Sequence, residues 1–149
     1  MKLVDANVLL YAVNESDERH REARGWLDDA LNGREPLGFA WVVLLAFLRL
    51  STKVGLFPHP LPVVDATRQV EEWTNQPPSV VVQPTTQHLA LVTGLVTATG
   101  TGGNLVSDAH LAALASEHGA TVITYDSDFG RFPGVTWRSP GDTSTARGR

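Results

Sequence analysis

Short apolar segments alternate with helical stretches along almost the whole chain, and this alternation limits the possible fold more than any other feature. The segments that read as strands are apolar throughout instead of alternating with polar residues, which is typical of a parallel sheet covered by helices on both faces. We therefore expect an α/β fold. The predicted strands are Lys2–Val4, Pro36–Phe39, Ser79–Val82, Ala120–Tyr125 and Val135–Trp137.

Helical periodicity and helix-ending residues place the remaining elements. The segment Trp41–Leu50 is apolar almost all round, which predicts a buried helix. Proline and glycine predict loops over Gly55–Pro62 and Thr99–Gly103. Residues 1–138 form one predicted domain, and Ser139–Arg149 a flexible tail. The other predicted helices run from Ala6 or Asn7 to Ala12, from about Asp17 to Leu31, and over Val63–Thr74, Thr86–Thr97 and Leu105–His118.

Composition excludes several classes of protein. The chain has no cysteine, which rules out disulfides and thiolate metal sites and suits a cytoplasmic protein. No apolar run reaches the ~18 residues of a membrane span, and the N-terminus does not resemble a signal peptide. The formal net charge is −4, so overall charge gives no indication of nucleic-acid binding.

Four aspartates are predicted to gather at one edge of the sheet. Asp5 lies inside the apolar run LVDANVLLYAV, where a charge is costly unless it is paired or binds a metal. Asp126 follows the strand that ends in VITY, and Asp128 lies two residues further on. Asp108 lies in the first turn of a helix, in NLVSDAHLAALA. Carboxylates that converge repel one another unless a cation lies among them, and hard oxygen ligands favour Mg²⁺ or Mn²⁺.

Each aspartate also has a simpler interpretation. Asp5 and Asn7 are both good helix N-caps. Asp108 is well placed to interact with a helix dipole, and Asp126 with Asp128 fits ordinary turn chemistry. The joint arrangement favours a metal site, because two acids that end strands together with a third on the intervening helix rarely arise by chance.

These residues resemble the PIN domain, and more narrowly the VapC-type toxins of VapBC toxin–antitoxin pairs. The resemblance rests on LVDANVLLYAV, the FLR helix segment, NLVSDAHLAALA and VITYDSDFGRFPGVTW, and covers the chain to about Trp137. It implies a three-layer α/β/α sandwich around a mostly parallel sheet of four to five strands. It also implies a Mg²⁺- or Mn²⁺-dependent endoribonuclease that cleaves tRNA or rRNA, inhibits translation, forms a homodimer and is inhibited by a cognate VapB antitoxin.

The resemblance also implies roles for individual residues. Asp5, Asp108 and Asp126 match the metal-binding acids, Asn7 a polar helper and Asp128 a frequently acidic position. The family usually carries a glutamate on the helix after the second strand. Here Phe47, or Ala46 in a shifted register, takes its place.

Several other side chains are candidates for contacts with RNA or a partner. Arg131, Arg49 and Lys53 could bind phosphates, and Ser107 could donate to a phosphate oxygen. The simpler interpretation is a solvated surface or an ion pair for the basic residues and a helix cap for Ser107. The five histidines show no metal-ligand spacing, so we interpret them as structural or surface groups. Three tryptophans read as mainly core, with any exposed member available to an antitoxin helix: Trp26, Trp41 and Trp73.

Two other functions fit parts of the pattern. A phosphatase of the haloacid-dehalogenase type would place an aspartate where Asn7 stands and would need a lysine at its site, for which the chain offers Lys2 and Lys53. A catalytically weakened PIN-like module that binds RNA or a protein would explain the missing glutamate. The chain retains four of the family's site residues, which argues for the active enzyme: Asp5, Asn7, Asp108 and Asp126.

Overall fold

The computed structural model describes residues 1–144 and forms a five-stranded sheet between two layers of helices. All strand pairs are parallel, and the order is β3-β2-β1-β4-β5. The expected α/β class and the three-layer arrangement are therefore confirmed. The strands are β1 (Lys2–Val4), β2 (Leu37–Ala40), β3 (Ser79–Val82), β4 (Thr121–Ile123) and β5 (Trp137–Arg138).

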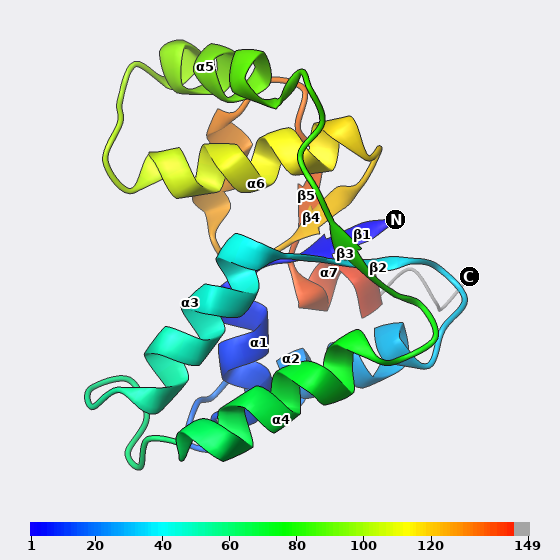
Figure 1. Ribbon diagram of the computed structural model, residues 1–149, viewed down its shortest axis with the longest axis vertical. Helices are drawn as coiled ribbons and strands as arrows, with labels where there is room; N and C mark the ends of the chain where they lie inside the picture. Colours follow the sequence, from blue (N-terminus) through cyan, green and yellow to red (C-terminus); the bar gives the residue numbers. More distant parts are fainter. Residues whose placement is uncertain (145–149) are drawn as a thin grey trace.

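Helices cover both faces of the sheet. Figure 1 shows α5 and α6 on one side and α1, α2 and α4 on the other. The helix α3 follows β2 and contacts both α1 and α4. The helices are α1 (Ala6–Val13), α2 (His20–Leu31), α3 (Trp41–Thr52), α4 (Val63–Thr74), α5 (His88–Thr99), α6 (Leu105–Glu117) and α7 (Pro140–Ser144), with a 3₁₀ helix η1 over Ser127–Arg131.

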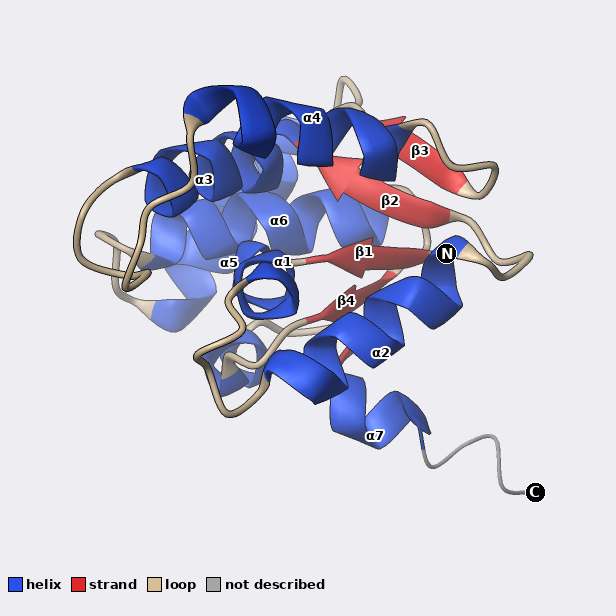
Figure 2. Cartoon of the chain, turned by 90° about the horizontal axis from the view of Figure 1, so that it is seen from below, coloured by secondary structure: helices blue, strands red, loops and turns tan. Residues whose placement is uncertain are grey.

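The core lies between β1, β2 and β4 and the helices that cover them. Its largest fully buried side chains include Phe39, Phe47 and Phe129. Gly38 of β2 is a close-packing position, since a Cβ there would come within 3.0 Å of the Leu3 side chain. In Figure 2 the strand arrows point to one common side, so the carboxyl ends of the strands form one edge of the sheet.

Three sequence predictions need correction. Residues 140–144 are not part of a flexible tail, because they form α7, which packs against α2; residues 145–149 lie outside the described part. The helix α3 is not buried all round, since Trp41 is 53% and Leu45 58% exposed. The last strand begins at Trp137 instead of Val135.

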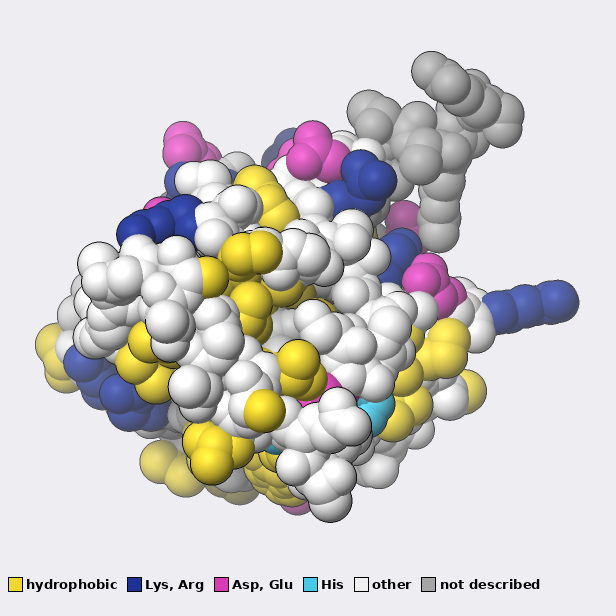
Figure 3. All heavy atoms as spheres, turned by 90° about the horizontal axis from the view of Figure 1, so that it is seen from above, with side chains coloured by type: hydrophobic (Ala, Val, Ile, Leu, Met, Phe, Trp, Pro, Cys, Tyr) yellow, Lys and Arg dark blue, Asp and Glu magenta, His cyan; other side chains and the backbone are white. Residues whose placement is uncertain are grey.

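The outer helix α5 is the least enclosed part of the fold. Leu95 is its one buried residue, while Leu89 is largely exposed. On the face seen in Figure 3, hydrophobic side chains and white atoms, which are backbone or other side chains, fill much of the centre, and most Lys, Arg, Asp and Glu side chains lie toward the edges. The basic groups that a nucleic acid would need are therefore not concentrated on this face.

Candidate active site

Asp5 lies at the carboxyl end of β1, where it begins α1. Its backbone N–H donates to the carbonyl of Ile123, which ties it to β4. Its Oδ1 accepts a hydrogen bond of 2.7 Å from the N–H of Ala6, so Asp5 is the N-cap that one interpretation of the sequence required. The second oxygen, Oδ2, accepts from Thr124 and Asn7. The cap therefore leaves the carboxylate at the edge, where a metal site was predicted.

Thr124 joins the two strand ends, and sequence reasoning did not single it out. It is fully buried, and its hydroxyl donates to Asp5 Oδ2 at 2.8 Å. The hydroxyl oxygen of Thr124 in turn accepts from Asn7 Nδ2 and from the backbone N–H of Asp126, both at 3.0 Å. A threonine in an apolar strand is ordinary β-sheet composition, so the sequence carried no signal for this role.

Asn7 connects the two sides of this network. Its Nδ2 donates to Asp5 Oδ2 at 3.3 Å and to the Thr124 hydroxyl, while its Oδ1 accepts from the N–H of Tyr125 at 3.1 Å. Every polar atom of the side chain thus holds the end of β1 to the segment after β4. These bonds fix the orientation of the Asp5 carboxylate, and a helper role of Asn7 in catalysis stays a prediction.

Asp126 and Asp128 lie in the turn after β4. Asp126 caps η1, because its Oδ1 accepts from the N–H of Asp128 at 2.9 Å. Its backbone is held by Thr124, so the direction of the side chain is set by the same hydroxyl that holds Asp5. Asp128 is exposed. The turn interpretation is therefore correct locally, and it leaves Asp126 Oδ2 without a hydrogen-bond donor among residues 1–144.

Asp108 faces the other acids from the first turn of α6. Burial and the charges of Asp5, Asp126 and Asp128 raise its pKa to about 6. Burial also raises the pKa of Asp5, against the lowering effect of its hydrogen bonds to Thr124 and Ala6, and the charge of Asp126 adds to the rise. The predicted acids are thus close enough to interact electrostatically.

The donor set suits a hard divalent cation. Within residues 1–144, no three acidic or histidine side chains stand close enough to hold one ion by themselves. An ion at this edge would therefore bind partly through water, as Mg²⁺ commonly does. Binding would relieve the repulsion that raises the pKa of Asp108. The residues present fit Mg²⁺ or Mn²⁺ better than a softer metal, because they offer oxygen and no thiolate.

Replacing Asp108 with asparagine is expected to stabilise the metal-free protein near neutral pH. Because the folded pKa is raised from 3.8 to about 6, the stability that protonation of Asp108 contributes is fully present below about pH 3.8 and is lost as the pH rises through about 6. The variant should therefore melt above the wild type at pH 7.5 in EDTA, by a margin that narrows toward pH 4. Scanning calorimetry at both pH values tests this, with Asp65→Asn as control. An equal margin at both would contradict it.

A cavity of about 410 Å³ opens beside Asp5 and Asp108. Ser107 of α6 lines it, and so do Ala46 and Arg49 of α3. Phe47 does not, since it is fully buried and its ring packs edge-on against Trp73 at 4.8 Å between centroids. Of the two registers considered for the missing glutamate, the structure therefore assigns Ala46 to the wall of the site and Phe47 to the core.

The residues predicted to contact RNA lie on different elements, and two of them line the cavity. Arg131 is part of η1, is exposed, and donates to the Thr101 hydroxyl at 3.3 Å. Lys53 follows the last residue of α3, is exposed, and is not among the residues that line the cavity. The candidate RNA contacts that line the cavity itself are Ser107 and Arg49.

Four of the five histidines contact other groups and His59 is exposed, which fits their interpretation as structural or surface groups. His88 lies between Glu117 and His110, with distances of 2.8 Å from Nδ1 to Glu117 Oε2 and 2.7 Å from Nε2 to His110 Nδ1. His118 contacts the carbonyl of Gln83, and His20 that of Tyr11. These contacts fasten α5 to α6 and α2 to α1.

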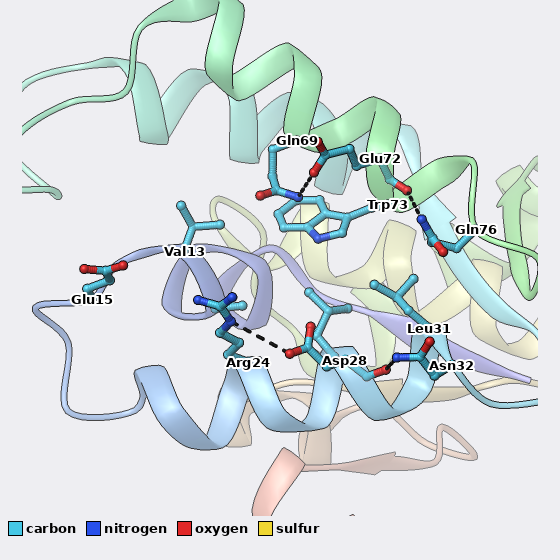
Figure 4. A pocket seen from close by; sticks show the side chains of 12 residues that line it. Val13, Glu15, Arg24, Asp28, Leu31, Asn32, Gln69, Glu72, Trp73 and Gln76 are labelled. Atoms are coloured by element: carbon cyan, nitrogen blue, oxygen red, sulfur yellow. Dashed lines mark hydrogen bonds and ion pairs between the residues drawn. The ribbon is translucent and has the colours of Figure 1, made fainter.

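A second hollow, of about 450 Å³, lies away from the acids between α1, α2 and α4. In Figure 4, Arg24 and Asp28 of α2 face Gln69, Glu72 and Trp73 of α4 across it. Arg24 pairs with Asp28 at 3.8 Å. Its lining includes none of the predicted metal ligands.

Comparison with known proteins supports the same interpretation. The PIN domain model matches residues 2–135. The chain is 59% identical over 140 residues to Ribonuclease VapC37 of Mycobacterium tuberculosis, covering 94% of this chain and 97% of that one. It is 36% identical to Ribonuclease VapC33 of the same species, covering 94% and 98%.

Solved structures share the fold at low sequence identity. A toxin–antitoxin complex from Klebsiella pneumoniae superposes with a TM-score of 0.66 at 17% identity, covering 94% of this chain and 98% of that one. Each helix formed by residues 1–144 is too short or too polar to cross a lipid bilayer. The fold, the acidic edge and these relatives together establish that the chain belongs to the PIN domain family and, within it, to the VapC ribonucleases.

Proposed function

We propose that this VapC-family ribonuclease is the toxin of a toxin–antitoxin pair, a Mg²⁺- or Mn²⁺-dependent endoribonuclease that cleaves tRNA or rRNA and so inhibits translation. The observation that carries the proposal is the edge where the Thr124 hydroxyl holds Asp5 and the backbone of Asp126 together, with Asp108 opposite. The ribonucleases that are 59% and 36% identical over nearly the whole chain support it.

In this mechanism each side chain at the edge has one task. Asp5, Asp108 and Asp126 would hold the ion partly through bridging water, since the three are not close enough to ligate it all directly, and Asp128 could add a further contact through water. A bound divalent ion supplies an activated water and neutralises charge on the scissile phosphate. Asn7 and Thr124 keep the Asp5 carboxylate oriented. The remaining contacts would come from the cavity wall, where Ser107 and Arg49 could meet phosphate oxygens.

Cleavage should depend strictly on metal, because the acids alone repel phosphate. Antitoxin-free protein is incubated with a mixed tRNA and rRNA pool in Mg²⁺, in Mn²⁺ and in excess EDTA. We expect discrete cuts with either ion, none in EDTA, and recovery when Mn²⁺ is restored. Cuts that persist in excess EDTA would contradict the mechanism. Hydrolysis of p-nitrophenyl phosphate without RNA cleavage would instead indicate the phosphatase alternative.

The alternative of a weakened PIN-like module has one observation in its favour. Ala46 occupies the wall that faces Asp5 and Asp108, so α3 adds no carboxylate to the site. A module of this kind would bind Mn²⁺ poorly and would leave the RNA pool intact. The same assay, combined with Mn²⁺ titration calorimetry, therefore separates the enzyme from the module.

We also propose a VapB-type antitoxin and a second copy of the chain as partners. An arginine of the antitoxin placed among the acids would satisfy the charge that the ion otherwise neutralises. Trp41 and Leu45, one turn apart on α3 and more than half exposed, offer an apolar surface for an interface. Light scattering gives the oligomeric state, and inhibition of cleavage by the neighbour-encoded protein tests the antitoxin.

A further inference from the structure

One exposed arginine is held by aromatic rings beside the acidic edge. The guanidinium carbon of Arg19 lies 5.0 Å from the ring centroid of Tyr11 and 5.7 Å from that of Tyr125. The two rings meet edge to face at 5.4 Å. Stacking of this kind orients a planar guanidinium and leaves its N–H groups free to donate.

The rings belong to the elements that build the active site. Tyr125 immediately precedes Asp126, and its backbone N–H donates to Asn7 Oδ1, the side chain that orients Asp5. The hydroxyl of Tyr125 donates to Glu22 Oε1 at 3.0 Å, which fixes the ring to α2. Arg19 is therefore attached to the acidic edge through Tyr125.

The backbone before α2 also places Arg19. Its N–H donates to Asp17 Oδ1 at 2.8 Å, in the turn that leads into the helix. Figure 2 shows the loop between α1 and α2 on the side to which the strand arrows point. Among the side chains described, those of residues 1–142, the Arg19 guanidinium has no hydrogen-bond or ion-pair partner, so its donors are available to a ligand. This differs from Arg24 and Arg68, which pair with Asp28 and Asp65.

The site needs such a cation. Asp5, Asp108, Asp126 and Asp128 concentrate negative charge at the edge, and the whole chain carries −4. A nucleic-acid backbone approaching this edge needs positive charge close by, and a guanidinium is the side chain best matched to phosphate. Arg49 lies in the cavity between α3 and α6, whereas Arg19 lies with α1 and α2. The two arginines therefore stand on different elements and would contact different phosphates of one RNA strand.

We propose that Arg19, oriented by Tyr11 and Tyr125, binds a backbone phosphate of the RNA next to the scissile one. This inference rests on the ribonuclease function proposed above and adds a substrate-binding residue to the same site. The tyrosine rings set the direction of the guanidinium, and its charge supplies the affinity.

The test compares Arg19→Gln, at the N-cap of α2, with Arg24→Gln, which removes the same charge from within α2. Binding is measured by anisotropy with a single-stranded 2′-O-methyl RNA, which cannot be cleaved, and cleavage is measured by steady-state kinetics. For Arg19→Gln we expect about tenfold weaker binding, a KM about tenfold higher and a kcat within about twofold of wild type. The slope of log affinity against log salt should fall by about 0.7 in magnitude. Arg19→Lys should keep the slope and recover part of the affinity.

The outcomes separate this inference from the proposed function. If the wild type cleaves RNA and the Arg19→Gln and Arg24→Gln variants behave alike, the inference is wrong and the nuclease stands. If the wild type shows no metal-dependent cleavage, the proposed function fails, and the inference fails with it. Both arginines are exposed, so we expect every variant to fold, and thermal denaturation checks this.

Discussion

Replacing Asp5 with asparagine is expected to reduce RNA cleavage on the order of a thousandfold while the protein stays folded. Asparagine is as good an N-cap as aspartate, so the bond to the N–H of Ala6 can persist. The charge that would bind the ion is lost. The amide nitrogen of the new asparagine would take the place of Asp5 Oδ2 and face two donors, Thr124 and Asn7, which is unfavourable. The substitution also removes the cost of burying a charge. Because the two effects oppose each other, the unfolding free energy should change by no more than about 2 kcal/mol.

Single-turnover cleavage in Mn²⁺, with thermal denaturation of the same preparation, measures both effects. Asp5→Ala should lose the activity too, and about 1 kcal/mol of stability with the cap. The matched control is Asp65→Asn, which removes an exposed carboxylate paired with Arg68 on α4. Cleavage by Asp5→Asn at the wild-type rate would mean that Asp5 only caps the helix.

The Thr124→Val variant should damage both stability and cleavage. Valine matches threonine in shape but removes three partly buried hydrogen bonds, those with Asp5, Asn7 and the N–H of Asp126. Leaving these groups without a partner should lower the unfolding free energy by about 2 to 4 kcal/mol. The Asp5 carboxylate also loses a hydrogen bond that lowers its pKa, so it will bind metal less readily.

Because Thr124 orients a ligand instead of binding the ion, we expect cleavage to fall about 10- to 100-fold. Urea unfolding measures the loss of stability, and Mn²⁺ titration measures the loss of metal affinity. Thr124→Ser keeps the hydroxyl and serves as the control, with activity close to wild type. If Thr124→Val lost stability but kept its affinity for Mn²⁺ and its rate, the hydroxyl would be structural only.

That the acids share one edge could be predicted from the sequence, because their positions after predicted strands and their negative charge both indicate a common site. Asp5 and Asp126 each follow an apolar strand, and parallel strands bring such residues to one edge. The helix bounds were also close, because caps and glycines are local signals. These features depend on residues near one another in the chain.

What the sequence missed depends on contacts between distant segments. Thr124 looks like any strand residue until the carboxylate of Asp5 lies beside it. The place of Ala46, and not Phe47, at the site is set by the rotation of α3 against α1 and α4. The helix at residues 140–144 lies in a segment rich in glycine, serine and threonine, and its contact with α2 was not visible from composition.

The strand order has a consequence for how the protein is made. β1 is the first strand to be synthesised, yet it lies at the centre of the sheet and pairs with β4, which comes from the last third of the chain. Domains generally fold as units during synthesis, and this one lacks a central pairing until β4 has emerged. Asp5 therefore has no Thr124 and no Asp126 beside it for most of translation. If the proposed site is the catalytic one, a growing chain would therefore lack the complete site until the segment after β4 has been made.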